Sequence, residues 1–270
     1  MFESLDGVNI KNLSIENPKK KEKSFFDPEK ELTEEMWQKI VAEINRLRGS
    51  KNWYFAYCMA RAKVVFPSRF GEFKLSQDDW DMVRKRIDKE KKEGDNLTAL
   101  RVASHAKILF PEHIREIQKL LPWNNVSVLM EDNNPWIMQN LKILYPEKTV
   151  SYSDGVQTEL GADIQKSYRR KEWLILAEYL GVYKILFPGK KTGVKLNDEF
   201  WQGVKDELKR YSEKKEIRSF LYYAMCLKLI AAKEIKITDT SFEVIMPEEK
   251  PDFKEALPPM PQYKKFGKRS

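Results

Sequence analysis

A five-residue word recurs along the chain and constrains its fold more than any other feature. The word is a lysine, two aliphatic residues, Phe or Tyr, and then Pro, and it occupies residues 63–67, 107–111, 142–146 and 184–188. A decayed fifth copy, without the aromatic residue and the proline, lies at 228–232. Self-similarity with a period of 20 to 50 residues is the signature of a repeat architecture. The chain is therefore expected to fold as successive copies of one unit.

Each word is predicted to end a helix. Proline excludes helical geometry from the residue before it, so four helices should end at Phe66, Phe110, Tyr145 and Phe187, which we expect to act as structural anchors of the repeat. The lysine falls in the last helical turn, where a positive charge complements the helix dipole. That role is favoured over the alternative, in which the recurrent lysines form a ladder that binds a ligand.

A second word, upstream of most of these lysines, is typical of a helix start. A leucine precedes Thr, Ser or Asn, the residues that cap helix N-termini, and a tryptophan follows. Apolar residues then recur at the spacing of one face of an amphipathic helix. The tryptophans are expected to be core anchors rather than platforms on which a ligand stacks. They are Trp37 after Thr33, Trp80 after Ser76, and Trp201 after Asn197.

Together the two words predict an all-α protein of about five degenerate helix pairs, stacked with a right-handed sense as a HEAT- or TPR-like α-solenoid or a compact helical array. The expected repeat domain is 32–246, with copies at 32–74, 75–111, 112–149, 150–195 and 196–236 and a truncated further start at 237–246. Residues 1–31 are expected to be a poorly ordered extension, and 247–270 a tail rich in Pro and Lys.

The two words resemble those of uncharacterised α-helical repeat proteins of uncultivated small-genome bacteria. The resemblance covers roughly residues 32–246 and rests on the Lys-Ile-Leu-Phe-Pro and Leu-Ser-x-x-x-Trp patterns. It implies the repeat and no activity. The repeat length is also that of HEAT units, but the HEAT consensus is absent.

No residue pattern predicts catalysis, a cofactor or a metal. His105 and His113 have no ligand partners at metal-site spacing, and the Gly-Lys-Lys-Thr-Gly segment at 189–193 lacks the spacing of a phosphate-binding loop. Cys58 and Cys226 lie in apolar stretches, as buried thiols of a reducing compartment do. We therefore expect a non-enzymatic, cytoplasmic protein that does not insert into a membrane.

The charge distribution gives the remaining functional hint. The formal net charge is +8, and residues 166–218 hold 14 basic against 8 acidic residues. The favoured function is an interaction scaffold that binds a protein or peptide through its helical-repeat surface. The alternative is a nucleic-acid-binding repeat protein that uses the basic second half, although such a cluster is more often a solvated face. The candidate residues are Arg169, Arg170, Lys171, Lys190, Lys191, Lys195, Lys209 and Arg210.

Overall fold

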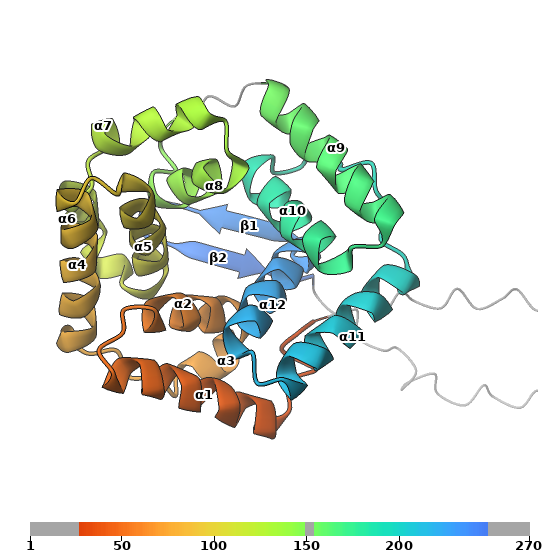
Figure 1. Cartoon of the computed structure of the whole chain (residues 1–270), viewed down its shortest axis with the longest axis horizontal. Coiled ribbons are helices and arrows are strands. Elements are labelled where there is room, and N and C mark those ends of the chain that lie inside the picture. The colour runs from red at the N-terminus through yellow and green to blue at the C-terminus, as the bar shows by residue number, and fades with distance from the viewer. Residues whose placement is uncertain (1–26, 149–153, 248–270) are drawn as a thin grey trace, which may run out of the picture.

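A computed structural model describes residues 27–148 and 154–247 of the chain. Helices dominate these residues, and a two-stranded hairpin is the only sheet among them, so the predicted all-α class is confirmed. Five inner helices surround the centre of the molecule, and further helices lie outside them (Figure 1). The inner helices are α2 (Phe55–Val65), α5 (Asn96–Leu109), α8 (Pro135–Leu144), α10 (Trp173–Leu186) and α12 (Ile217–Ala231).

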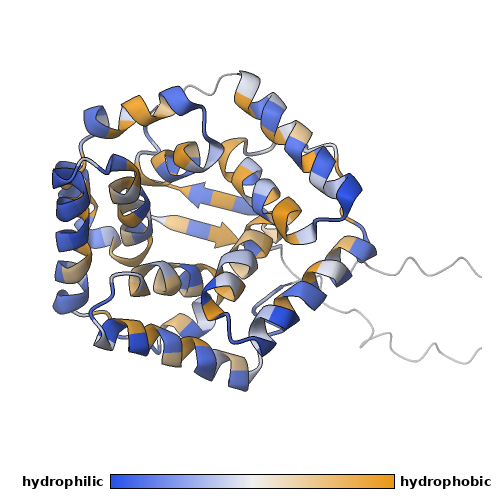
Figure 2. Ribbon diagram, in the orientation of Figure 1, coloured by the Kyte–Doolittle hydropathy of each residue, from blue (hydrophilic) through white to orange (hydrophobic). Residues whose placement is uncertain are grey.

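The outer helices alternate with the inner ones along the chain. The long ones are α1 (Glu34–Gly49), α4 (Gln77–Lys92), α9 (Asp154–Arg170) and α11 (Asp198–Glu213). The third copy instead has short helices, namely α6 (Ile114–Leu120), α7 (Trp123–Val126) and the 3-10 helix η2 (Ser127–Asp132). Two more short helices, α3 (Pro67–Phe70) and η1 (Pro111–His113), begin at the prolines of the first two words. Hydrophobic residues are concentrated on the inner helices, whereas the outer ones carry them as stripes between hydrophilic residues (Figure 2).

The copies form a closed ring. Each inner helix packs against the next, and α12 then packs against α2. The ion pair between Arg218 of α12 and Glu43 of α1, 2.9 Å long, also crosses this seam. Successive copies pack side by side, and the last copy also contacts the first, whereas an open stack would leave these two apart. The right-handed sense of the arrangement stays a prediction.

The helix ends lie where the two words place them. Phe66, Phe110, Tyr145 and Phe187 are the C-cap residues of α2, α5, α8 and α10, and all four share φ values from −127° to −122° and ψ values from 58° to 66°. All four rings are buried. The side chains of Thr33, Ser76 and Asn197 accept hydrogen bonds from backbone N–H groups of the helices that follow them. The words thus act as local start and stop signals.

The lysines of the words join neighbouring copies. Each of the first four donates a hydrogen bond from Nζ to a carbonyl oxygen near the end of the next inner helix. The bonds are Lys63 to Ile108 at 2.7 Å, Lys107 to Ile143 at 2.6 Å, Lys142 to Leu186 at 3.2 Å and Lys184 to Ile230 at 2.7 Å. These lysines therefore satisfy the last carbonyls of the neighbouring helix in addition to lying near the end of their own.

The fifth lysine, Lys228, has carboxylate partners instead. Its Nζ lies 2.9 Å from Asp27 Oδ1 and 3.1 Å from Glu29 Oε2. Glu29 also accepts a hydrogen bond from Ser68 Oγ, so residues 27–31 tie the last copy to the first. This corrects the expectation that all of residues 1–31 are poorly ordered. Residues 1–26, 149–153 and 248–270 lie outside the described residues.

The expected helix start at 237–246 is wrong. The segment belongs to an antiparallel hairpin of β1 (Glu234–Ile237) and β2 (Phe242–Ile245). Ile235, Ile237, Phe242 and Val244 pack against the main core, which is the alternation typical of a strand with one covered face. The Ile-Thr pair at 237–238 resembles the cap word but leads into a turn.

The tryptophan anchors are confirmed in two copies and corrected in the third. Trp37 and Trp80 are buried and contact the C-cap rings of their own copies, with centroids 5.9 Å from Phe66 and 5.6 Å from Phe110. Trp201 is only half-buried, and Phe200 beside it is fully buried instead. In this copy the Phe200 ring meets Trp173, which leads α10, at a centroid distance of 6.0 Å.

We predict that Trp80→Ala lowers the free energy of unfolding by about 3–5 kcal/mol, because it leaves a large cavity in the core. Trp201→Ala is the matched control and should cost no more than about half as much, since part of that side chain already contacts solvent. Urea unfolding of both variants measures the difference. Equal losses, or a near-zero loss for Trp80→Ala, would contradict this assignment of the core.

Candidate functional site

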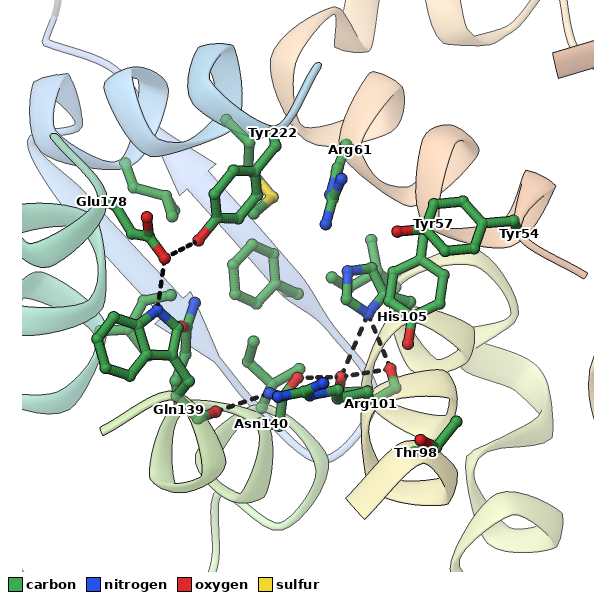
Figure 3. A pocket seen from close by; sticks show the side chains of 18 of the residues that line it. Tyr54, Tyr57, Arg61, Thr98, Arg101, His105, Gln139, Asn140, Glu178 and Tyr222 are labelled. Atoms are coloured by element: carbon green, nitrogen blue, oxygen red, sulfur yellow. Dashed lines mark hydrogen bonds between the residues drawn. The ribbon is translucent and has the colours of Figure 1, made fainter. Parts of the chain in front are cut away.

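The centre of the ring encloses a pocket of about 560 Å³. All five inner helices and β2 contribute to its wall (Figure 3). The lysine bonds hold the C-terminal ends of the inner helices at one level, and Lys107 also donates to Thr238 O in the turn of the hairpin. The hairpin crosses the ring centre in Figure 1, and its Phe242 lines the pocket. The central pocket is therefore closed at the end where the inner helices stop.

Most of the lining residues occupy equivalent positions of the repeat, and these form three layers. The floor layer lies one residue after the lysine of each word, the middle layer two residues before it, and the rim layer six residues before it. The floor layer is Ile108, Ile143, Ile185 and Leu229, together with Phe242; the middle layer is Arg61, His105 and Asn140; the rim layer is Tyr57, Arg101, Trp136, Glu178 and Tyr222.

Arg61 presents an unpaired guanidinium to the pocket. No carboxylate of the described residues forms an ion pair with it, and its Nε atom is buried without a hydrogen-bond partner among them. The guanidinium lies 4.7 Å from the ring centroid of Tyr222 and 5.7 Å from that of Tyr57. These cation–π contacts fix its position and leave its remaining N–H groups available. Arg61 is thus a fixed positive charge that lacks an anion.

The other charges around the pocket differ in how far they are satisfied. Arg86 has an ion pair with Glu90 at 2.7 Å and lies 4.6 Å from the Trp53 ring centroid. Arg101 is exposed at the rim and forms no ion pair with the described carboxylates. Glu178 is the one acid in the lining, so the two unpaired arginines make the central pocket net positive.

Glu178 is held by two neighbouring copies. Its Oε1 accepts hydrogen bonds from Trp136 Nε1 at 2.8 Å and from Tyr222 Oη at 2.6 Å. Burial raises the pKa of Tyr222 well above its usual value, so the phenol keeps its proton and remains a donor. The three side chains come from α8, α10 and α12. This carboxylate therefore ties three inner helices together near the rim.

His105 is a neutral hydrogen-bonding group in the middle layer. Its Nδ1 lies 2.8 Å from the carbonyl oxygen of Arg101. Because a carbonyl oxygen only accepts, Nδ1 carries the proton and Nε2 keeps its lone pair. Burial of the ring, together with the Arg61 charge, lowers the pKa of His105 to about 3. Figure 3 shows the ring between that carbonyl and the Arg61 guanidinium.

With a pKa near 3, His105 is a weak proton acceptor at neutral pH. Ser104 Oγ donates to Asn140 Oδ1 at 2.5 Å, so this hydroxyl is already engaged with an amide. Within the described residues no group of three or more His, Cys, Asp and Glu side chains is arranged to hold a metal ion. What the central pocket offers is a positive charge, hydrogen-bonding groups and aromatic walls above an apolar floor.

The basic residues singled out in the sequence lie away from the central pocket. Arg169 and Arg170 end α9, and Lys171 follows them. Lys190, Lys191 and Lys195 lie on the loop after α10, which reaches α9 through a bond from Tyr168 Oη to Lys195 O at 3.4 Å. Lys209 and Arg210 lie on α11. The structure thus brings the basic residues at the end of α9 and those of the loop after α10 to one region of the surface.

Several of these basic side chains have acidic neighbours. The ion pairs are Lys171–Glu199 at 2.5 Å, Arg170–Glu172 at 3.9 Å, Arg210–Glu207 at 2.7 Å and Lys209–Glu213 at 3.9 Å. A solvated face with interspersed acids has this character. Phosphate binding by this surface stays a prediction.

The two recurrent words do not predict the central pocket. Arg61 belongs to neither word, and the spacing of His105 argues only against a metal site. Yet the repeat itself carries the signal. With the copies aligned on the word lysine, the position six residues earlier holds Tyr, Arg, Trp, Glu and Tyr, and such polar and aromatic variety is unexpected on a helix face that only packs.

Comparisons with known proteins found no relative of this chain. No protein family, no curated protein sequence and no solved structure matches the chain. Among the helices of the described residues, none combines the length and the apolar character needed to cross a membrane.

We predict a pH dependence of stability that arises from His105. Its pKa is lower in the folded chain than the value of about 6.5 in the unfolded chain, so the unfolded state binds more protons between pH 6.5 and 3. The free energy of unfolding must therefore fall as the pH falls through this range. At pH 5 the loss from this group is about 2 kcal/mol relative to pH 7.

The measurement is urea unfolding of the wild type and of His105→Gln at pH 7 and pH 5. The variant should lose less stability between the two pH values, by about the same amount. An identical loss in both proteins would show that folding does not lower the pKa of His105.

Proposed function

We propose that the protein is a non-enzymatic binding protein that takes an acidic segment of a partner protein into the centre of its ring. The unpaired guanidinium of Arg61 is the observation that carries the proposal. A partly buried charge is costly unless it is paired, and a carboxylate of the partner supplies the missing charge. An arginine–carboxylate pair can be bidentate, which adds geometric specificity to the attraction.

The aromatic and hydrogen-bonding wall supports a peptide ligand. Trp53, Tyr54 and Tyr57 line one side of the central pocket, and Trp136 and Tyr222 line another. Tyrosine, tryptophan and arginine are the residues that dominate binding energy at protein interfaces. A volume of about 560 Å³ suits a few side chains of a partner, whereas sequence-independent binding of nucleic acid needs several exposed basic groups along the phosphates.

The test uses a fluorescein-labelled hexapeptide, Glu-Glu-Ser-Glu-Glu-Leu, with a free carboxyl terminus. Fluorescence anisotropy should show saturable binding, and Arg61→Gln should weaken it at least about tenfold, since a hydrogen bond to a charged group contributes about 1.5–3 kcal/mol. Arg115→Gln, which removes an exposed arginine of α6, is the matched control and should bind as the wild type does. The same peptide with Lys in place of Glu should not bind.

Two further measurements test the basic residues of α9 and of the loop after α10. A variant with Gln at Arg169, Arg170, Lys171, Lys190, Lys191 and Lys195 should bind the peptide as the wild type does. Loss of peptide binding in this variant but not in Arg61→Gln would move the site to the outer surface. Salt-sensitive binding of labelled single- or double-stranded DNA that this variant abolishes, with no binding of the peptide, would favour the nucleic-acid alternative.

A further inference from the structure

We infer that the group bound in the central pocket is the carboxyl-terminal residue of a partner chain, with its α-carboxylate on Arg61 and an apolar side chain on the floor layer. This inference rests on the proposed function and specifies which part of the partner enters the ring.

Because the central pocket is closed at its floor, only a chain end or a single side chain of the partner can enter it. Phe242 of the hairpin lies beneath the inner helices, and Ile143, Ile185 and Leu229 around it are almost fully buried. An extended segment that threads through the ring would have to displace the hairpin, which is held by Lys107 and by its own contacts with the core. The central pocket is therefore a dead end for a polypeptide.

The order of the layers distinguishes a chain end from an acidic side chain. His105 and Ile108 are three residues apart on α5, and Asn140 and Ile143 are three apart on α8. At a rise of about 1.5 Å per residue, the polar middle layer lies roughly 4.5 Å above the apolar floor. A Glu or Asp side chain ends in its carboxylate and places no apolar group against the floor layer. A terminal residue carries both a carboxylate and a side chain on one carbon, so it satisfies both layers.

The hydrogen-bonding groups of the middle layer match the same ligand. Arg61 only donates, and the Nε2 atom of the neutral His105 only accepts. A terminal residue offers an acceptor and a donor close together, because its α-carboxylate and its amide N–H are attached to the same α-carbon. An internal apolar residue lacks the carboxylate. The pair Arg61 and His105 thus fits a peptide carboxyl terminus better than either an internal apolar segment or an isolated acid group.

The charges of the central pocket restrict the sequence that precedes the bound terminal residue. The rim layer holds Arg101 and the middle layer holds Arg61. Like charges repel, so an acidic or neutral sequence before the terminal residue fits the pocket, and a basic one does not.

The decisive experiment compares the labelled Glu-Glu-Ser-Glu-Glu-Leu peptide as a free acid and as a carboxyl-terminal amide. The amide should bind at least about tenfold more weakly, because it removes one negative charge at Arg61. Replacement of the last Leu by Ser in the free acid should also weaken binding, because the peptide then buries less apolar surface against the floor layer. Arg61→Gln should bind the acid and the amide with equal, low affinity, while Arg115→Gln should keep the difference between them.

The outcomes separate this inference from the proposed function. If the acid and the amide bind the wild type equally and Arg61→Gln binds neither, the inference is overturned, and an internal acidic segment remains as the ligand. No binding of either peptide would count against both. N-acetyl-leucine should compete only weakly with the peptide. If it binds as tightly as the hexapeptide does, the ligand is a small apolar acid, and the inference of a partner chain end is overturned.

Discussion

The hydrogen bond from each of the first four word lysines to the end of the next inner helix is the interaction on which the arrangement of the copies depends. It holds the C-terminal ends of neighbouring inner helices side by side at one level. Burial lowers the pKa of Lys107 to about 8 and also lowers that of Lys63, Lys142 and Lys184, which shows the desolvation that these bonds offset. Because the ends are level, equivalent repeat positions face the centre at equivalent depths, and the layers of the central pocket follow.

The copies share the residues that end their inner helices and differ in the side chains that line the central pocket. The lysine occurs in all five copies and an aromatic C-cap residue in four, whereas the middle-layer position holds Arg61, His105 and Asn140 in three copies and buried Val182 and Cys226 in the others. One backbone unit thus supplies a positive charge, an acceptor and an amide to a single site. The site is asymmetric although the ring that holds it is built from repeats.

The sequence predicted what local chemistry determines. Proline and the N-cap residues act within one or two turns, so the helix ends at Phe66 and Phe110 were predictable. Closure of the ring was not, because it depends on small rotations summed over five copies and on packing between α2 and α12. The hairpin was missed because Ile237-Thr238 imitates the cap word. Arg61 was missed because its role arises only when five copies surround one axis.

The closed ring is the central claim, and spin-label distances test it most directly. Exposed Gln38 of α1, Ala162 of α9 and Lys209 of α11 are suitable sites for labelled cysteines, because burial raises the pKa of the native Cys58 and Cys226 thiols to about 11 and about 12 and keeps them unreactive. In the ring, α11 is the direct neighbour of α1 and α9 is not (Figure 1). Pulsed electron paramagnetic resonance should therefore give a shorter distance between the two spin labels in the Gln38→Cys, Lys209→Cys variant than in the Gln38→Cys, Ala162→Cys variant. The reverse order would mean that the copies form an open stack and that the pocket is not enclosed.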